Sequence, residues 1–310
     1  MIRTAWTLFV AIIATLISAN GVMIAGFLGM VDREGGIYDR LQNQWARMIL
    51  WAAGVRVVTH GEEHLTGKEI IVGNHVSWFD VFSVAAAIPR CRFVAKSEVR
   101  RIPFIGRSAE VAGHVYIERE NRKAALEQYK DAATRIHAGT HVVVFAEGTR
   151  GHAYALRPFK KGPFVLAVSA EAPIVPMLIY GTIPVMPKDK WGVRSGTVHI
   201  HFLPAITTKG LTYDDRNALA VQTRNAMTAL LELYPLLSLL SLLSLLSLLS
   251  LLSLLSLLSL LSLLSLLSLR FAANCHLPTA NCCHVHNHVR PRPRNPRFAR
   301  QSYDRSRCLS

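Results

Sequence analysis

The spacing of apolar and polar residues predicts a long membrane-associated segment at the start of the chain. Residues 5–31 carry no charge and, as a helix, are long enough to cross a hydrocarbon core of about 30 Å. Two other interpretations stay open: a signal peptide cleaved near Ala19, or a re-entrant pair of helices that turns at Asn20-Gly21. Because the apolar run continues to Val31, a retained segment is favoured.

A second helix is predicted by the next stretch, YDRLQNQWARMILWAA, in which apolar residues recur at near-helical spacing. Its two tryptophans suit a membrane interface, although a helix that packs on a soluble core fits the pattern nearly as well. Residues 1–53 are therefore expected to form membrane-associated helices.

From residue 54 onward, short β-type runs alternate with helical segments. The predicted strands are 55–59, 69–74, 91–96, 115–119, 141–146, 173–180 and 197–203, and the predicted helices are 78–88, 121–138, 159–171 and 213–234. This alternation is typical of an α/β fold with a mostly parallel central sheet flanked by helices. We expect this domain to span residues 54–235, with the N-terminal hydrophobic segment as its membrane anchor.

The last part of the chain has a different composition. Eleven near-perfect Leu-Leu-Ser triplets fill most of residues 236–269, and as a helix they would be about 50 Å long. The serines would spiral around that helix, so the tract is either a second membrane segment or an aggregation-prone low-complexity repeat. Residues 270–310 are rich in Arg, Pro, His and Cys without periodicity, which predicts a basic disordered tail.

Charge and composition narrow the class of partner. The chain has 35 Lys and Arg against 20 acidic residues, a net charge of +15, which indicates nucleic acid, an anionic bilayer surface or a phosphorylated substrate. The tail has few aromatics to stack on bases, which argues against nucleic acid. Only Cys91 precedes the tail, as in a reducing compartment. The Cys and His residues of the tail match no closed zinc pattern, so neither a metal nor another cofactor is expected.

The stretch IIVGNHVSWFD, residues 70–80, combines a predicted buried strand with a candidate catalytic pair. Ser77-x-x-Asp80 has the form of a helix-capping box, which would place His75 in the preceding loop and Asp80 in the first helical turn. A carboxylate that holds an imidazole in one tautomer makes a general base. On these residues alone, a structural cap beside an ordinary loop histidine is equally acceptable.

Further polar groups follow other predicted strands. Lys96, Arg119 and Glu147 each end or follow a strand, as His75 does, and in a parallel sheet all four would lie on the rim where ligands bind. Arg119 and a second arginine, Arg150, offer planar forks that suit a phosphate.

The turn Glu147-Gly148-Thr149-Arg150 would present a backbone N–H, a hydroxyl and a guanidinium together. Glu147 either orients one of the arginines or forms a simple structural ion pair. The sequence has no G-x-S-x-G elbow and no phosphate-binding G-x-x-x-x-G-K-[ST] loop, so direct attack by an activated substrate hydroxyl is favoured.

These motifs together resemble the sequence blocks of the glycerolipid acyltransferases. NHVSWFD resembles the H-x-x-x-x-D block, FAEGTR resembles F-P-E-G-T-R, GHVYIER is similar to the block between them, and IVPM is similar to the fourth block. The resemblance covers residues 38–235. Two positions depart from the family pattern: Ala146 replaces proline, and Glu118 stands where aspartate is common.

The resemblance implies transfer of an acyl group from acyl-CoA or acyl-carrier protein to the sn-2 hydroxyl of lysophosphatidic acid, which gives phosphatidic acid. It implies that His75 deprotonates this hydroxyl and that Asp80 orients the imidazole. Arg119 and Arg150 would hold the phosphate, supported by the other polar groups of the rim and turn, Lys96, Glu147, Gly148 and Thr149.

The same resemblance places the active site on the cytoplasmic face of a membrane, with a bacterial inner membrane as the expected location. An acyltransferase for another acceptor, such as a lyso-ornithine lipid, is an alternative. A catalytically silent membrane protein that binds anionic lipid is a second alternative.

Overall fold

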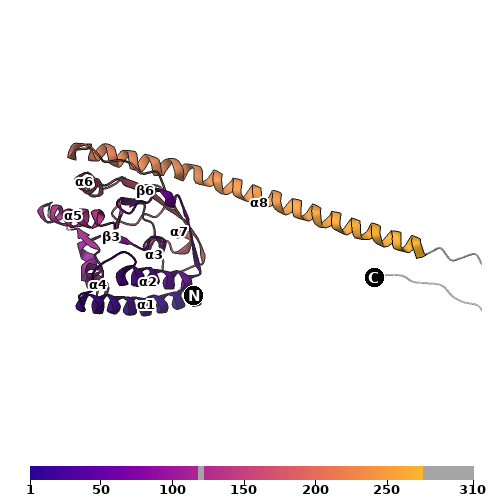
Figure 1. Cartoon of the computed structure of the whole chain (residues 1–310), viewed down its shortest axis with the longest axis horizontal. Coiled ribbons are helices and arrows are strands. Elements are labelled where there is room, and N and C mark those ends of the chain that lie inside the picture. Colours follow the sequence, from indigo (N-terminus) through magenta and orange to yellow (C-terminus); the bar gives the residue numbers. More distant parts are fainter. Residues whose placement is uncertain (118–121, 275–310) are drawn as a thin grey trace, which may run out of the picture. The chain divides into compact units, whose positions relative to one another are not determined.

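Seven strands form one sheet of order β1-β7-β6-β2-β5-β3-β4 in a computed structural model that describes residues 1–117 and 122–274 (Figure 1). The chain divides into two units, residues 1–242 and 243–310, and the sheet belongs to the first. The strands are β1 (Val55–His60), β2 (Ile70–Gly73), β3 (Cys91–Lys96), β4 (Val115–Ile117), β5 (His141–Phe145), β6 (Ile174–Tyr180) and β7 (Gly196–Phe202).

The sheet is parallel at every pairing except that between β6 and β7. The predicted mostly parallel sheet is therefore confirmed. Five neighbouring strands, from β6 to β4, consequently have their carboxyl ends along one edge. Gly73 pairs with Phe145 and Val94 with Val144, so the chain leaves β2, β5 and β3 at nearly the same level.

Helices cover both faces of the middle of the sheet, which explains why β2 and β6 are apolar on both faces. The side chains of β2 alternate: Ile71 faces a core shared with α2 (Ile37–Ala53) and α3 (Trp78–Ala87). Ile70 and Val72 face the other core, shared with α5 (Arg122–His137), α6 (Gly162–Ser169) and α8 (Arg216–Asn274). Short helices complete the domain: α4 (Ile105–Val111), α7 (Thr182–Val185), η1 (Glu62–His64), η2 (Ser97–Arg101) and η3 (Tyr213–Asp215).

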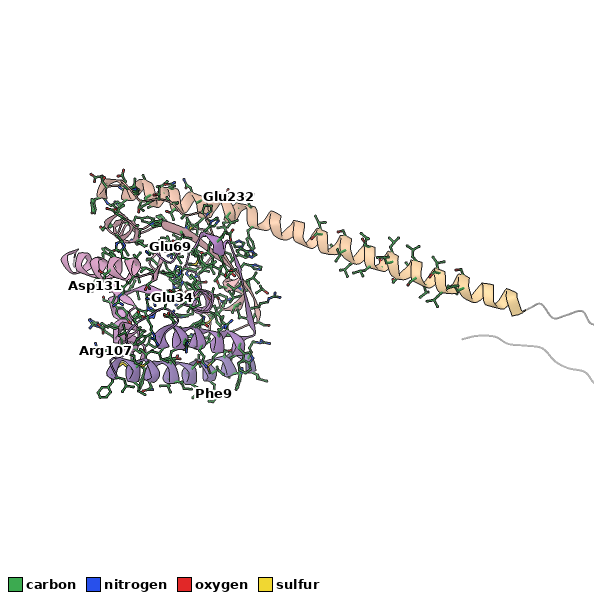
Figure 2. The ribbon with its side chains drawn as sticks, viewed as in Figure 1. Phe9, Glu34, Glu69, Arg107, Asp131 and Glu232 are labelled. Carbon is green, nitrogen blue, oxygen red and sulfur yellow. The ribbon has the colours of Figure 1, made fainter. Side chains whose placement is uncertain are left out.

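The N-terminal apolar run forms one helix, α1 (Ile2–Phe27), that packs along α2 (Figure 1). It continues through Asn20 and Gly21, so the re-entrant interpretation is wrong. Gly21 permits close packing, because a Cβ there would lie 3.0 Å from Cδ1 of Leu41. The opposite face of α1 is apolar and open, and Figure 2 shows Phe9, which is 59% exposed, on that outer side.

A cluster of buried ion pairs links α2 and the loop before it to strand β3 of the sheet. Arg92 of β3 is fully buried and lies 2.7 Å from Oδ1 of Asp39 in α2 and 2.8 Å from Oδ1 of Asp32 in the loop before it. Arg90 approaches Oδ2 of Asp39 at 3.5 Å. A fully buried guanidinium is tolerated only where carboxylates compensate its charge, so this cluster fixes the register of α2 against β3.

The Leu-Leu-Ser tract continues helix α8, which ends at Asn274, beyond residue 270 where the tail was expected to begin. The serines from Ser247 to Ser265 each donate their hydroxyl to the carbonyl of the serine three residues earlier. Ile2–Phe27 and Leu246–Leu266 are the two helices, among the described residues, that are long and apolar enough to cross a membrane. The expected disorder of the tail concerns residues 275–310, which lie outside the described part.

We expect Asp39→Ala to lower the free energy of unfolding by about 3 kcal/mol, because it removes a carboxylate from the fully buried Arg92. Denaturant titration followed by tryptophan fluorescence measures this loss. Asp32→Ala is the matched control: its side chain is 27% exposed, so water can replace it and the loss should be smaller. Equal losses in the two variants would contradict the assigned role of Asp39.

Candidate active site

His75 lies in the loop between β2 and α3, where a buried carboxylate holds its ring. Nδ1 of His75 is 2.8 Å from Oδ2 of Asp80, whose side chain has no exposed surface. Because a buried carboxylate accepts hydrogen bonds, Nδ1 carries the proton and Nε2 keeps its lone pair. The His75 side chain is 15% exposed, so a substrate can reach it.

The oxygen of Asp80 that holds His75 also caps helix α3. It accepts the backbone N–H of Val76 at 2.7 Å and that of Ser77 at 2.8 Å. Oγ of Ser77 accepts the N–H of Phe79, so the predicted capping box is confirmed. Helix capping and imidazole orientation are therefore not alternatives here, since one buried oxygen serves both.

Two further contacts fix the position of the imidazole. Its ring stacks on Phe145 at the end of β5, with centroids 4.3 Å apart and an angle of 13° between the planes. The neighbouring Asn74 is buried and bonds through both amide atoms to the backbone of Ile179 in β6, at 2.7 and 3.0 Å. The loop is thus attached to the strands on both sides of β2.

The turn after β5 is bonded directly to the histidine loop. Oε1 of Glu147 accepts the backbone N–H of His75 at 3.0 Å, and the N–H of Gly151 donates to the carbonyl of His75 at 2.7 Å. Gly148 has a φ of +78°, in the left-handed region that favours glycine, which lets the turn fold back toward His75. The predicted meeting of the two motifs at the sheet edge is therefore present in the structure.

Glu147 orients Arg157, an arginine that the sequence motifs did not identify. Oε2 of Glu147 lies 2.8 Å from Nε of Arg157. The other guanidinium nitrogens donate to Oγ1 of Thr149, at 3.1 Å, and to its carbonyl oxygen. Glu147 thus forms an ion pair with Arg157 that stabilises the turn, whereas its predicted orientation of Arg119 concerns a residue outside the described part and stays a prediction. Arg157 lies 10 residues beyond Glu147 in a loop, and no spacing rule links the two.

The remaining predicted cations lie around this pair or outside the described residues. The guanidinium carbon of Arg150 lies 4.8 Å from the ring centroid of Trp78, at the start of α3. Lys96 is the half-buried last residue of β3, on the same edge of the sheet. Arg119 lies outside the described residues, two positions beyond the end of β4 at Ile117.

A cavity of about 840 Å³ lies between the sheet and α6, on the face of the sheet that α5 and α6 cover. Phe145, the residue on which His75 stacks, forms part of its wall. Most of the other lining side chains are apolar, including Val94, Val144 and Leu166, and Lys160 adds a positive charge. The Phe145 ring on which His75 stacks packs with the core on the opposite face of the sheet, so the cavity approaches the catalytic loop at the end of β5.

Comparison with known proteins identifies the fold and the family. The acyltransferase family model matches residues 56–180. A 1-acyl-sn-glycerol-3-phosphate acyltransferase of Limnanthes douglasii is 31% identical over 221 residues, which cover 69% of this chain and 78% of that protein. The chain belongs to the family of 1-acyl-sn-glycerol-3-phosphate acyltransferases.

Other members of this acyltransferase family give the same result. The alpha enzyme of Homo sapiens is 34% identical over 183 residues, which cover 58% of this chain and 65% of that protein. The crystal structure of the acyltransferase PlsC from Thermotoga maritima aligns with a TM-score of 0.62 at 24% identity, over 75% of this chain and 95% of that one. The likeness to PlsC shows a shared fold. The span matched by the family model contains the His75–Asp80 pair and the Glu147–Arg150 turn.

We expect Arg157→Ala to raise the KM for the lipid acceptor by about tenfold with a smaller change in kcat. The turn that carries Arg150 would lose the hydrogen bonds that Arg157 makes to Glu147 and Thr149. Steady-state acyltransferase assays measure the two constants separately. Arg157→Lys is the matched control, since it keeps the charge near Glu147 but cannot bond Thr149 and Glu147 with one planar fork. An unchanged KM in Arg157→Ala would show that the turn holds its shape alone.

Proposed function

We propose that this chain transfers a fatty acyl group from a thioester to the sn-2 hydroxyl of lysophosphatidic acid, which gives phosphatidic acid. The observation that carries the proposal is the His75–Asp80 pair, joined at 2.8 Å and bonded to the Glu147 turn. Family membership supports the same reaction. We assign the activity to the α/β domain, residues 54–235, with acyl-CoA or acyl-carrier protein as the donor.

The reaction begins with proton transfer to Nε2 of His75. As this nitrogen takes the proton of the sn-2 hydroxyl, the acceptor oxygen attacks the thioester carbonyl and forms a tetrahedral intermediate. The intermediate collapses with loss of the thiolate, which takes the proton back from the imidazolium. Asp80 stabilises the imidazolium between these steps, because its carboxylate is buried beside Nδ1.

The phosphate of the acceptor binds beside this pair, on the cationic side of the rim. Arg150 forms no ion pair with any described residue, and its contact with the Trp78 ring leaves its N–H groups available to an anion. Thr149 contributes a hydroxyl from the same turn, and Gly148 shapes that turn, since its own backbone N–H donates to the carbonyl of Phe145 at 3.0 Å. Lys96 and Arg119 complete the set of cations that we assign to the phosphate.

The apolar cavity beside Phe145 is the proposed site of the acyl chain. Its volume of about 840 Å³ lies in the range of small-molecule pockets, and its walls are mostly apolar. The cavity reaches the end of β5 at Phe145 and Ala146, next to Glu147, which bonds the backbone of His75.

We infer that the outer face of α1 rests in an anionic membrane surface. Trp6 and Trp51 are 45% and 71% exposed and lie in edge contact at 6.2 Å, an arrangement that suits the membrane interface. The positive net charge of the chain favours anionic lipid. Since acyl-CoA and acyl-carrier protein are cytoplasmic, we place the active site on that face of the membrane, with a bacterial inner membrane as the proposed location.

Replacement of the general base tests the assigned reaction. We expect His75→Ala to lose at least about 100-fold in kcat, the lower end of what general-base catalysis contributes. An acylation assay with lysophosphatidic acid measures the loss. His137→Ala, at an exposed position on α5, is the matched control and should keep full activity. Near-normal turnover by a folded His75→Ala protein would exclude His75 as the base.

Replacement of Arg150 tests the phosphate site. We expect Arg150→Ala to raise the KM for lysophosphatidic acid about tenfold, because one charge-assisted hydrogen bond is lost. Kinetics with monoacylglycerol, which has no phosphate, should not change in the same variant. A change confined to the KM of the acyl donor would contradict this role. If the wild-type chain acylates a lyso-ornithine lipid with a higher kcat/KM than lysophosphatidic acid, the proposed acceptor is wrong.

A further inference from the structure

Three histidines gather on the sheet outside the active site. His60 ends β1, and His199 and His201 belong to its neighbour β7. The parallel register pairs His60 with His201, and His199 lies two residues earlier on the same strand. Because side chains on a strand alternate between faces, the three imidazoles share one face of the sheet. Their nitrogens lie within 4.8 Å of one another.

The opposite face of β7 belongs to the hydrophobic core. Val198, Ile200 and Phe202 are buried there, whereas the histidines between them are only partly buried. Tyr234 of α8 covers one side of the histidines, in edge contact with His199 at 6.0 Å and with His201 at 5.5 Å. His60 stays exposed at the edge strand of the sheet, so the cluster is reached from solvent.

Within the described residues the cluster has no carboxylate partner, in contrast to His75 and His141. His75 and His141 each bond a buried carboxylate, that of Asp80 and that of Glu69. Among the described residues, no acidic group forms an ion pair with His60, His199 or His201. Nε2 of His201 is buried, and within the described part of the chain it has no hydrogen-bond partner.

Burial favours the neutral form of the two imidazoles on β7, those of His199 and His201. Burial, together with the neighbouring His60 and His199, lowers the pKa of His201 to about 4. Burial, together with His60 and Arg56, also lowers the pKa of His199. Neutral imidazole is the form that ligates a metal ion, and it suits zinc, copper and nickel.

We propose that His60, His199 and His201 form a binding site for a divalent transition-metal ion of the zinc class, with water as the remaining ligand. Tetrahedral zinc has Zn–N bonds of about 2.0–2.1 Å, which separates its ligand nitrogens by about 3.3 Å. Nε2 of His60 and Nδ1 of His199 are 3.2 Å apart, at hydrogen-bond distance, so a bound ion would take the place of the proton between them.

Binding of one ion by all three histidines requires the imidazole rings to reorient. The three rings are stacked, with 9° between the planes of His60 and His201, 14° between those of His60 and His199, and 20° between those of His199 and His201, so their in-plane lone pairs do not converge on one point. Rotation of the imidazoles about their side-chain torsions, with most freedom for the exposed His60, is what directs one nitrogen of each ring toward a common ion. The bound ion then fastens β1, an edge strand, to the rest of the sheet, which couples metal binding to stability.

Cobalt(II) absorption tests the site in the full chain, purified in detergent without a histidine tag and stripped with a chelator. We expect one cobalt ion with the visible bands of tetrahedral coordination and without thiolate charge-transfer absorption, displaced by zinc. His199→Ala should weaken binding by more than about tenfold, which even outer-shell substitutions can reach. His137→Ala, at an exposed position on α5, is the matched control and should bind as the wild type does.

Thermal unfolding gives a second test of metal binding, and a second variant replaces His199→Ala if that protein does not fold. Zinc should raise the melting temperature of the wild type and of His137→Ala, but not that of His199→Ala. If His199→Ala does not fold, His60→Gln at the exposed position replaces it. The sequence beyond Asn274 contains cysteines and histidines of its own, and cobalt bound there would persist in the variants and show thiolate bands. Unchanged binding in the variants, or no binding by the wild type, would overturn the proposal.

Discussion

The active site depends on one buried oxygen, Oδ2 of Asp80. It accepts hydrogen bonds from the His75 ring and from the backbone of Val76 and Ser77, all within 2.8 Å. A carboxylate so buried is stabilised only if its partners stay in place, so the start of α3 and the orientation of the imidazole are coupled. Loss of any of these donors would expose the others to competition from water. The catalytic tautomer is thus a consequence of how the helix begins.

The parallel sheet supplies the second constraint, because its register decides which motif meets the histidine. Gly73 is paired with Phe145, so the chain leaves both strands at one level and Glu147 arrives beside the backbone of His75. The stacking of His75 on Phe145 follows from the same register. Motifs 72 residues apart in sequence are therefore brought into contact by strand pairing alone.

Much of this arrangement could be predicted from the sequence. The seven strands and the capping box follow from local patterns of apolar residues and from Ser77 and Asp80. The partners of long polar side chains could not be predicted in this way. Arg157 reaches Glu147 across a loop, and Arg92 reaches Asp39 from another element. The histidine cluster likewise depends on the pairing of β1 with β7, two strands that are neighbours in the sheet but far apart in the sequence.

The two long apolar helices show why hydropathy alone cannot assign a role. Helix α1 has one face that packs against α2 through small residues such as Ala14 and Gly21, and another face that is open. It can therefore bind the folded domain and lipid at once. The Leu-Leu-Ser helix has no such division, since leucines are exposed all along Leu246–Leu266. The serine hydroxyls from Ser247 to Ser265 donate to carbonyls of the same helix, so these hydroxyl protons have partners without water, which is the condition that a hydrocarbon environment imposes on polar groups.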